Sequence, residues 1–71
     1  MKVLVTGASG FLGQHLCAAL CDEFEVTGTF GSSATFAEDF PKVAARPLDL
    51  RDAAATKALV AAVAPDAVVH L

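Results

Sequence analysis

The sequence predicts an α/β fold in which four parallel strands are joined by crossover helices. Short runs of β-branched and aliphatic residues alternate with segments of helical period, which is typical of βαβ units. A glycine-rich turn separates the first such run from the first helical segment. With 71 residues, the chain has room for one small unit and no second domain.

The first half of the chain is predicted to form a strand, a helix and a second strand. Residues 3–5 are a continuous apolar run, as expected of a strand buried on both faces. Residues 11–22 have helical period, and residues 25–30 are the second strand, with Gly28 as its weak point. The helix carries an apolar stripe, with Cys17 at its margin, that comprises Leu12, Leu16 and Leu20 and continues to Phe24.

The second half is predicted to complete the alternation. Residues 31–34 have the composition of a turn, and a loop or an abbreviated helix follows up to Pro41. A short third strand is expected over 43–48. Asp52 is the expected N-cap of an alanine-rich helix that runs through residue 64 and stops at Pro65. Residues 67–71 form the fourth strand, and because the chain ends there, residues 1–71 are expected to be an incomplete, N-terminal part of a domain.

Composition and charge exclude several classes of protein. A formal charge of −3 argues against a nucleic-acid partner, which needs clustered lysine and arginine. No apolar stretch approaches the roughly 18 residues of a membrane span, and Gly7, Ser9 and Gly10 interrupt the first apolar run before it reaches the length expected of a signal peptide. Cys17 and Cys21 are too few for a disulfide scaffold and lack a second ligand pair for a metal, so we expect a cytoplasmic protein without a metal site.

Three glycines spaced by three, Gly7, Gly10 and Gly13, follow the first predicted strand. The first two permit backbone angles closed to other residues and let an anion approach the main chain. The third allows the helix to pack tightly against the strand. A tight turn without a ligand is the alternative interpretation, but a glycine inside a helix costs about 1 kcal/mol relative to alanine, which favours a functional reason.

The helix that follows would offer its first free amides to the same ligand. The N–H groups near Phe11 and Leu12 point out of the helix start together with the positive end of its dipole. Ser9 lies in the same loop and belongs to the predicted site. A pyrophosphate is the expected occupant.

In this stretch, which reads Thr-Gly-x-x-Gly-Phe-x-Gly, the sequence resembles the extended branch of the short-chain dehydrogenase/reductase superfamily, the NAD-dependent epimerases and dehydratases. The resemblance continues through residues 47–52 (Pro-Leu-Asp-Leu-Arg-Asp) and 65–71 (Pro-Asp-Ala-Val-Val-His-Leu), so it covers essentially the whole chain. It implies a partial Rossmann fold. Within the branch, the ending is most similar to dTDP-4-dehydrorhamnose reductases and to the regulatory beta subunits of methionine adenosyltransferase.

The resemblance also implies roles for single residues. The three glycines would form the phosphate loop, with Phe11 and Leu12 as backbone contacts. Asp49 and Leu50 match the positions beside the adenine ring, although Asp49 is equally well explained as a loop carboxylate or a helix-start residue. His70 matches a position near the nicotinamide ribose, but an ordinary strand residue is the preferred interpretation.

The end of the second strand bears on the choice between NAD and NADP. An acid there usually holds the ribose 2′-hydroxyl of NAD, and no carboxylate occurs from residue 26 to residue 37. Ser32 and Ser33 can donate hydrogen bonds to a 2′-phosphate, while no arginine lies nearby in the sequence. NADP is therefore preferred to NAD as the cofactor.

The resemblance implies a cofactor-binding function without catalytic residues in this chain. The Tyr-x-x-x-Lys pair of the superfamily is missing, since the chain has no tyrosine. The predicted function is the NAD(P)-binding portion of an oxidoreductase or epimerase/dehydratase acting on a nucleotide sugar or related small molecule, with a homo-oligomer left open. The alternatives are a non-catalytic NADP-binding regulatory subunit and a truncated chain of little stability.

Overall fold

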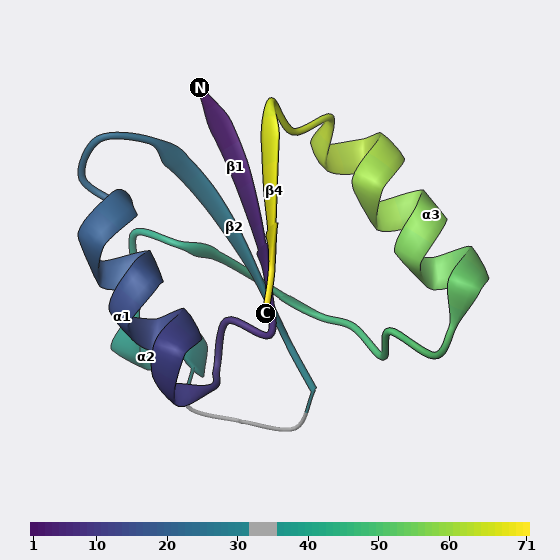
Figure 1. The fold of residues 1–71 in the computed structure, drawn as a ribbon, viewed down its shortest axis with the longest axis horizontal. Coiled ribbons are helices and arrows are strands. Elements are labelled where there is room, and N and C mark those ends of the chain that lie inside the picture. The colour runs from purple at the N-terminus through teal and green to yellow at the C-terminus, as the bar shows by residue number, and fades with distance from the viewer. Residues whose placement is uncertain (32–35) are drawn as a thin grey trace.

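The computed structural model describes residues 1–31 and 36–71, and over these residues strands and helices alternate as predicted (Figure 1). The strands are the four predicted, and the abbreviated helix expected before Pro41 is present as a single turn. In chain order, the elements are β1 (Lys2–Thr6), α1 (Phe11–Leu20), β2 (Glu25–Phe30), α2 (Phe36–Asp39), β3 (Ala44–Pro47), α3 (Ala53–Val63) and β4 (Ala67–His70).

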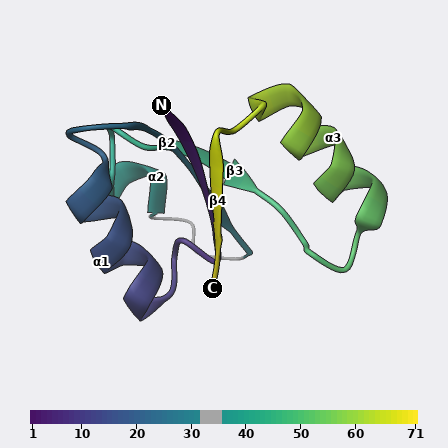
Figure 2. The ribbon, with the colours of Figure 1, turned by 45° about the horizontal axis from the view of Figure 1, so that its top comes forward.

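The four strands form one parallel sheet in the order β3-β2-β1-β4. In the register of the sheet, Val3 of β1 lies between Val26 of β2 and Ala67 of β4. The chain thus moves outward from β1 to β3 and then returns to the other side of β1. Helices α1 and α2 cover one face of the sheet and α3 the other (Figures 1 and 2). The predicted fold class is confirmed, and the strand order reverses between β1 and β4, where α/β sheets bind their ligands.

The core lies between the sheet and the helices α1 and α2. Phe36 is 1% exposed, and its ring lies 5.8 Å from the ring of Phe30 and 5.3 Å from that of Phe40. The other buried members of this cluster are small and come from five segments of the chain: Val3, Val5, Ala8, Cys17, Val26 and Val43. The site described below therefore rests on the best-packed part of the protein.

The predicted stripe is confirmed for Leu16, Leu20 and Phe24, which pack against the core, but not for its first member. Leu12 is 64% exposed, and the buried residues of the helix are Gly13 and Cys17. The cause is the approach at Gly13, where an added Cβ would lie 2.4 Å from the Gly7 carbonyl oxygen. That approach turns the 13/17 side of α1 to the sheet and leaves Leu12 in solvent. The helix also ends at Leu20, two residues before the prediction.

Helix α3 covers its face of the sheet only loosely. Its N-cap is Asp52 as predicted, with a side-chain oxygen that accepts a hydrogen bond from the Ala55 amide at 3.0 Å. Its C-cap, Ala64, has left-handed backbone angles (φ 47°). No residue of α3 is buried, and Val68 beneath it on β4 is 53% exposed. Local interactions, the cap above all, therefore carry much of the stability of this helix. Within the described residues, no helix is both long and apolar enough to cross a bilayer.

Candidate functional site

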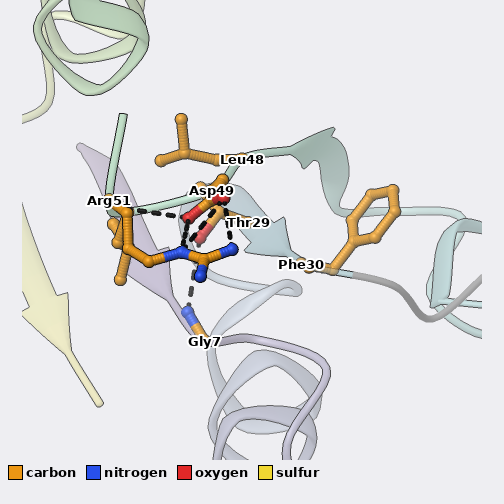
Figure 3. Close-up of a pocket in the computed structure, with 8 residues that line it drawn as sticks. Gly7, Thr29, Phe30, Leu48, Asp49 and Arg51 are labelled. Atoms are coloured by element: carbon orange, nitrogen blue, oxygen red, sulfur yellow. Dashed lines mark hydrogen bonds and ion pairs between the residues drawn. The ribbon is translucent and has the colours of Figure 1, made fainter. Parts of the chain in front are cut away.

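A pocket of about 460 Å³ lies at the carboxyl ends of β1, β2 and β3 (Figure 3). It is formed by the glycine turn after β1, the last residues of β2 and the segment that follows β3. The lining residues are Gly7, Thr29, Phe30, Gly31, Leu48, Asp49, Leu50 and Arg51. Leu48 extends the β2–β3 pairing by donating its amide to the Phe30 carbonyl at 3.0 Å, which holds these two lining residues together.

The turn between β1 and α1 is tied to the end of β2. Gly7 has φ +72°, a left-handed conformation that disfavours any other residue. Its amide donates to the Thr29 hydroxyl at 3.3 Å, and the amide of the buried Ala8 donates to the Thr29 carbonyl at 2.8 Å. The predicted need for glycine backbone angles is confirmed at Gly7 but wrong at Gly10, whose φ of −71° and ψ of 170° are open to any residue. Thr29 is the residue that anchors the turn.

The first turn of α1 presents unpaired backbone donors beside this pocket. Its N-cap is Gly10, which has no side chain to cap the helix, and no acidic residue occurs in the first turn. The Gly10 amide donates to the Gly7 carbonyl at 3.2 Å. The amides of Ser9, Phe11 and Leu12 form no hydrogen bond with any residue in the described ranges 1–31 and 36–71. An anion is the partner that such a helix start accommodates.

Two charged residues line the pocket, and they are paired with each other. Asp49 Oδ1 accepts hydrogen bonds from the Arg51 amide at 2.9 Å and from Arg51 Nε at 3.1 Å. Asp49 Oδ2 accepts from Arg51 Nη2 at 2.9 Å and from Nε at 3.3 Å. The Arg51 side chain, and after it the Arg51 amide, lowers the pKa of the Asp49 carboxyl below its ordinary value. The four contacts come from three N–H groups of Arg51, because the single Nε–H is shared between the two oxygens of Asp49.

The structure brings together part of the predicted site and adds to it. Gly7, Asp49 and Leu50 line the pocket, and Asp49 has the character of a loop carboxylate in an ion pair. The amide-bearing residues Ser9, Gly10, Phe11, Leu12 and Gly13 lie at the start of α1. Ser32 lies outside the described residues. The contacts of all these predicted site residues with a cofactor remain predictions.

Sequence reasoning did not predict five of the lining residues, which are Thr29, Phe30, Gly31, Leu48 and Arg51. Among them, Thr29 and Arg51 form side-chain hydrogen bonds at the site. No arginine neighbours the end of β2 in the sequence, yet the fold places Arg51 in the same pocket as Phe30 and Gly31. The available signal was the spacing of Asp49 and Arg51, two residues apart after a strand, which allows one side chain to fold back on the other.

His70 lies at the end of β4, directly opposite Thr6 of β1. The Thr6 hydroxyl and His70 Nδ1 share a hydrogen bond of 2.7 Å. This contact joins the two strands where the sheet order reverses, which fits the preferred interpretation of His70 as a strand residue. Over the described residues, no group of three or more His, Cys, Asp or Glu side chains is placed to hold a metal ion.

Comparisons with known proteins agree with this geometry. A family model for the NAD dependent epimerase/dehydratase family matches residues 3–71. The crystal structure of a proposed epimerase from Burkholderia cenocepacia is 36% identical, with a TM-score of 0.87 over 99% of this chain and 24% of that one. The Bordetella bronchiseptica enzyme WbmH, crystallised in complex with NAD+, is 28% identical, with a TM-score of 0.82 over 99% of this chain and 25% of that one. The chain therefore spans about a quarter of the length of these proteins, and it belongs to the NAD-dependent epimerase/dehydratase family.

Proposed function

We propose that the chain binds a nicotinamide dinucleotide as the cofactor part of an oxidoreductase or epimerase/dehydratase that acts on a nucleotide sugar. The observation that carries the proposal is the set of free amides at the start of α1, beside the pocket at the carboxyl ends of β1 to β3. The complex of WbmH with NAD+ supports it, since that protein has the same fold over this region.

The pyrophosphate is assigned to the start of α1. The amides of Ser9, Phe11 and Leu12 have no acceptor among the residues that the structure describes, and Gly10 keeps the approach to them open because it lacks a side chain. An added Cβ at Gly10 would meet only the Gly7 carbonyl oxygen, at 3.4 Å. Each charge-assisted hydrogen bond contributes about 1.5–3 kcal/mol, so two or three of them suffice to hold a diphosphate.

The adenosine is assigned to the pocket of about 460 Å³, which Asp49 and Leu50 line together with Gly7 of the glycine turn. The nicotinamide would then extend across β1 toward β4, over the point where the strand order reverses. The cofactor, when bound, supplies the hydride chemistry. This chain holds and orients it, whereas proton transfer to a sugar needs groups other than these residues, which include no tyrosine.

The proposal is tested by placing a carboxylate where the pyrophosphate is expected. Gly10→Asp puts a favoured N-cap residue at the start of α1, so the fold should be kept or slightly stabilised. The same carboxylate accepts from the helix amides and repels a phosphate, so we expect the affinity for NADH and NADPH to fall at least about tenfold. Titration calorimetry measures the binding, and urea unfolding measures the stability.

Ala54→Asp is the matched control, because it adds a carboxylate to the exposed first turn of α3, away from the pocket. It should leave the affinity for both dinucleotides unchanged. The proposal is wrong if the folded wild-type chain binds neither dinucleotide, or if Gly10→Asp binds them as tightly as the wild type does.

A further inference from the structure

The peptide between Ser9 and Gly10, which leads the chain into α1, is held by hydrogen bonds at both of its ends. Its N–H group donates to the Gly7 carbonyl at 3.2 Å. Its carbonyl group accepts a hydrogen bond of 2.7 Å from the side-chain nitrogen Nε2 of Gln14, which is half-buried. Because a peptide unit is planar, bonds to both ends fix the orientation of the whole unit.

Gln14 stands at the position of α1 from which a side chain can fix the entry of the chain into the helix. With Gly10 as the N-cap, Ser9 is the residue before the cap and Gln14 is the fourth residue of the helix. In many helices an apolar contact joins these two positions and sets the angle at which the chain enters. In this chain a hydrogen bond joins them instead.

The usual means of ordering a helix start would close the proposed phosphate site. A serine, threonine, aspartate or asparagine at the N-cap accepts from the second or third amide of the helix, which would then be occupied. Gly10 has no side chain that could do so, but a glycine loses more conformational freedom on ordering than any other residue. The Gln14 side chain orders the turn through a carbonyl group, so it occupies none of the donor amides.

We propose that Gln14 is a positioning residue for dinucleotide binding, which holds the peptide between Ser9 and Gly10 and so preorganises the amides that receive the pyrophosphate. This inference rests on the proposed function, because those amides belong to the same site. Gln14 acts through the turn and not through contact with the cofactor. Without its hydrogen bond, the turn would have to be ordered when the ligand binds, which weakens binding.

The chain on either side of this peptide is held independently of the Gln14 side chain. The amides of Gly7 and Ala8 donate to Thr29 of β2. The Gly10 carbonyl accepts from the backbone amide of Gln14 at 2.9 Å, which is a helical hydrogen bond. Loss of the side-chain bond should therefore loosen residues 9 and 10 without unfolding α1 or detaching the turn from the sheet.

Gln14→Met tests the inference, because methionine is similar to glutamine in length and helix propensity but has no hydrogen-bond donor. We expect the affinities for NADH and NADPH to fall by about three- to tenfold each, the value of one neutral hydrogen bond. Titration calorimetry measures both affinities, and urea unfolding establishes that the variant is folded under the same conditions.

Nitrogen NMR relaxation gives a readout that a change in the stability of α1 alone would not alter. In the free protein, the order parameters of the Ser9 and Gly10 amides should fall from about 0.85, typical of a rigid backbone, toward about 0.6 in Gln14→Met. Those of residues 13–20 should stay as in the wild type. Saturation with NADH should restore the order parameters of both amides, because the bound pyrophosphate orders the turn.

Thr56→Val is the matched control, because it also removes a side-chain hydrogen bond to a backbone carbonyl at a helix start. The Thr56 hydroxyl donates to the carbonyl of Asp52, the N-cap of α3, at 2.9 Å, and Thr56 does not line the pocket. This variant should bind both dinucleotides as the wild type does. Equal affinities of Gln14→Met and the wild type, or unchanged order parameters at Ser9 and Gly10, overturn the role of Gln14 and leave the proposed function standing. Failure of the folded wild type to bind either dinucleotide overturns the proposed function itself.

Discussion

Replacing Gly13 by alanine tests the close approach on which the site depends. An added Cβ would lie 2.4 Å from the Gly7 carbonyl oxygen and 2.7 Å from Ala8 Cα. Both atoms belong to the backbone of the turn, which is held to the end of β2 through Thr29. The turn cannot yield as a flexible side chain would, so α1 has to move away from the sheet.

The size of the effect follows from two opposing contributions. Ordinary contact begins near 3.4 Å, so the helix start must retreat by about 1 Å. Overpacking of this kind costs about 1–3 kcal/mol, and the rigid partners place Gly13→Ala at the upper end. Alanine recovers about 1 kcal/mol of helix propensity. We therefore expect a net loss of about 2 kcal/mol in the free energy of unfolding, or about 10 °C in Tm for a domain of this size.

Urea unfolding followed by circular dichroism measures this loss. Gly31→Ala is the matched control, because it adds the same methyl group where no atom of residues 1–31 and 36–71 lies within 4 Å, and its stability should stay within about 0.5 kcal/mol of the wild type. Gly13→Ala should also bind dinucleotides more weakly, since the displaced helix carries the donor amides away from the turn. A Gly13→Ala variant as stable as the wild type would refute the packing argument.

Three further predictions concern other parts of the chain. Asp52→Ala removes the cap of α3 and should cost about 1 kcal/mol in urea unfolding, whereas Asp52→Asn should cost much less. Burial, reinforced by the charge of Cys21, raises the pKa of the Cys17 thiol, so iodoacetamide should label Cys17 only after Cys21, and simultaneous labelling of the native protein would contradict this. Arg51 lowers the pKa of Asp49, so the ion pair stabilises the folded state above the ordinary aspartate value of 3.8, and this stabilisation is lost as the pH falls through the lower pKa of the folded protein. Carbon NMR should show that the Asp49 pKa rises in Arg51→Gln. An unchanged pKa would exclude the ion pair in solution.

The order and type of the elements could be predicted because each is specified locally. Residues 25–30 form the predicted strand, and Asp52 caps the predicted helix through its own side chain. The turn needs glycine at position 7 because of its positive φ, which is a property of that residue and not of its neighbours. Strands, helix caps and turn glycines each depend on a few consecutive residues, so they can be predicted from short stretches of sequence.

The remaining features depend on contacts between distant segments. Leucine spacing placed Leu12 in the core, but the touching backbones at Gly13 rotate α1 so that Cys17 is buried instead. Hydrophobic periodicity detects the positions of large apolar side chains. It does not detect a close contact that depends on a residue without a side chain, such as Gly13. Likewise, Arg51 reaches the end of β2 only because β3 pairs beside β2 in the sheet, with about twenty residues of chain between the two positions.

The site divides its tasks between a rigid part and an adjustable part. The amides at the start of α1 are held by the Gly13 contact and by the hydrogen bonds from the turn to Thr29, so their geometry is set by the core of the protein. Arg51 stands on an exposed segment and is held mainly by Asp49. Changes at the glycine turn should therefore alter stability and the binding of every dinucleotide together, because folding and phosphate binding use the same backbone. Changes at Arg51 should alter this exposed part of the pocket at almost no cost in stability.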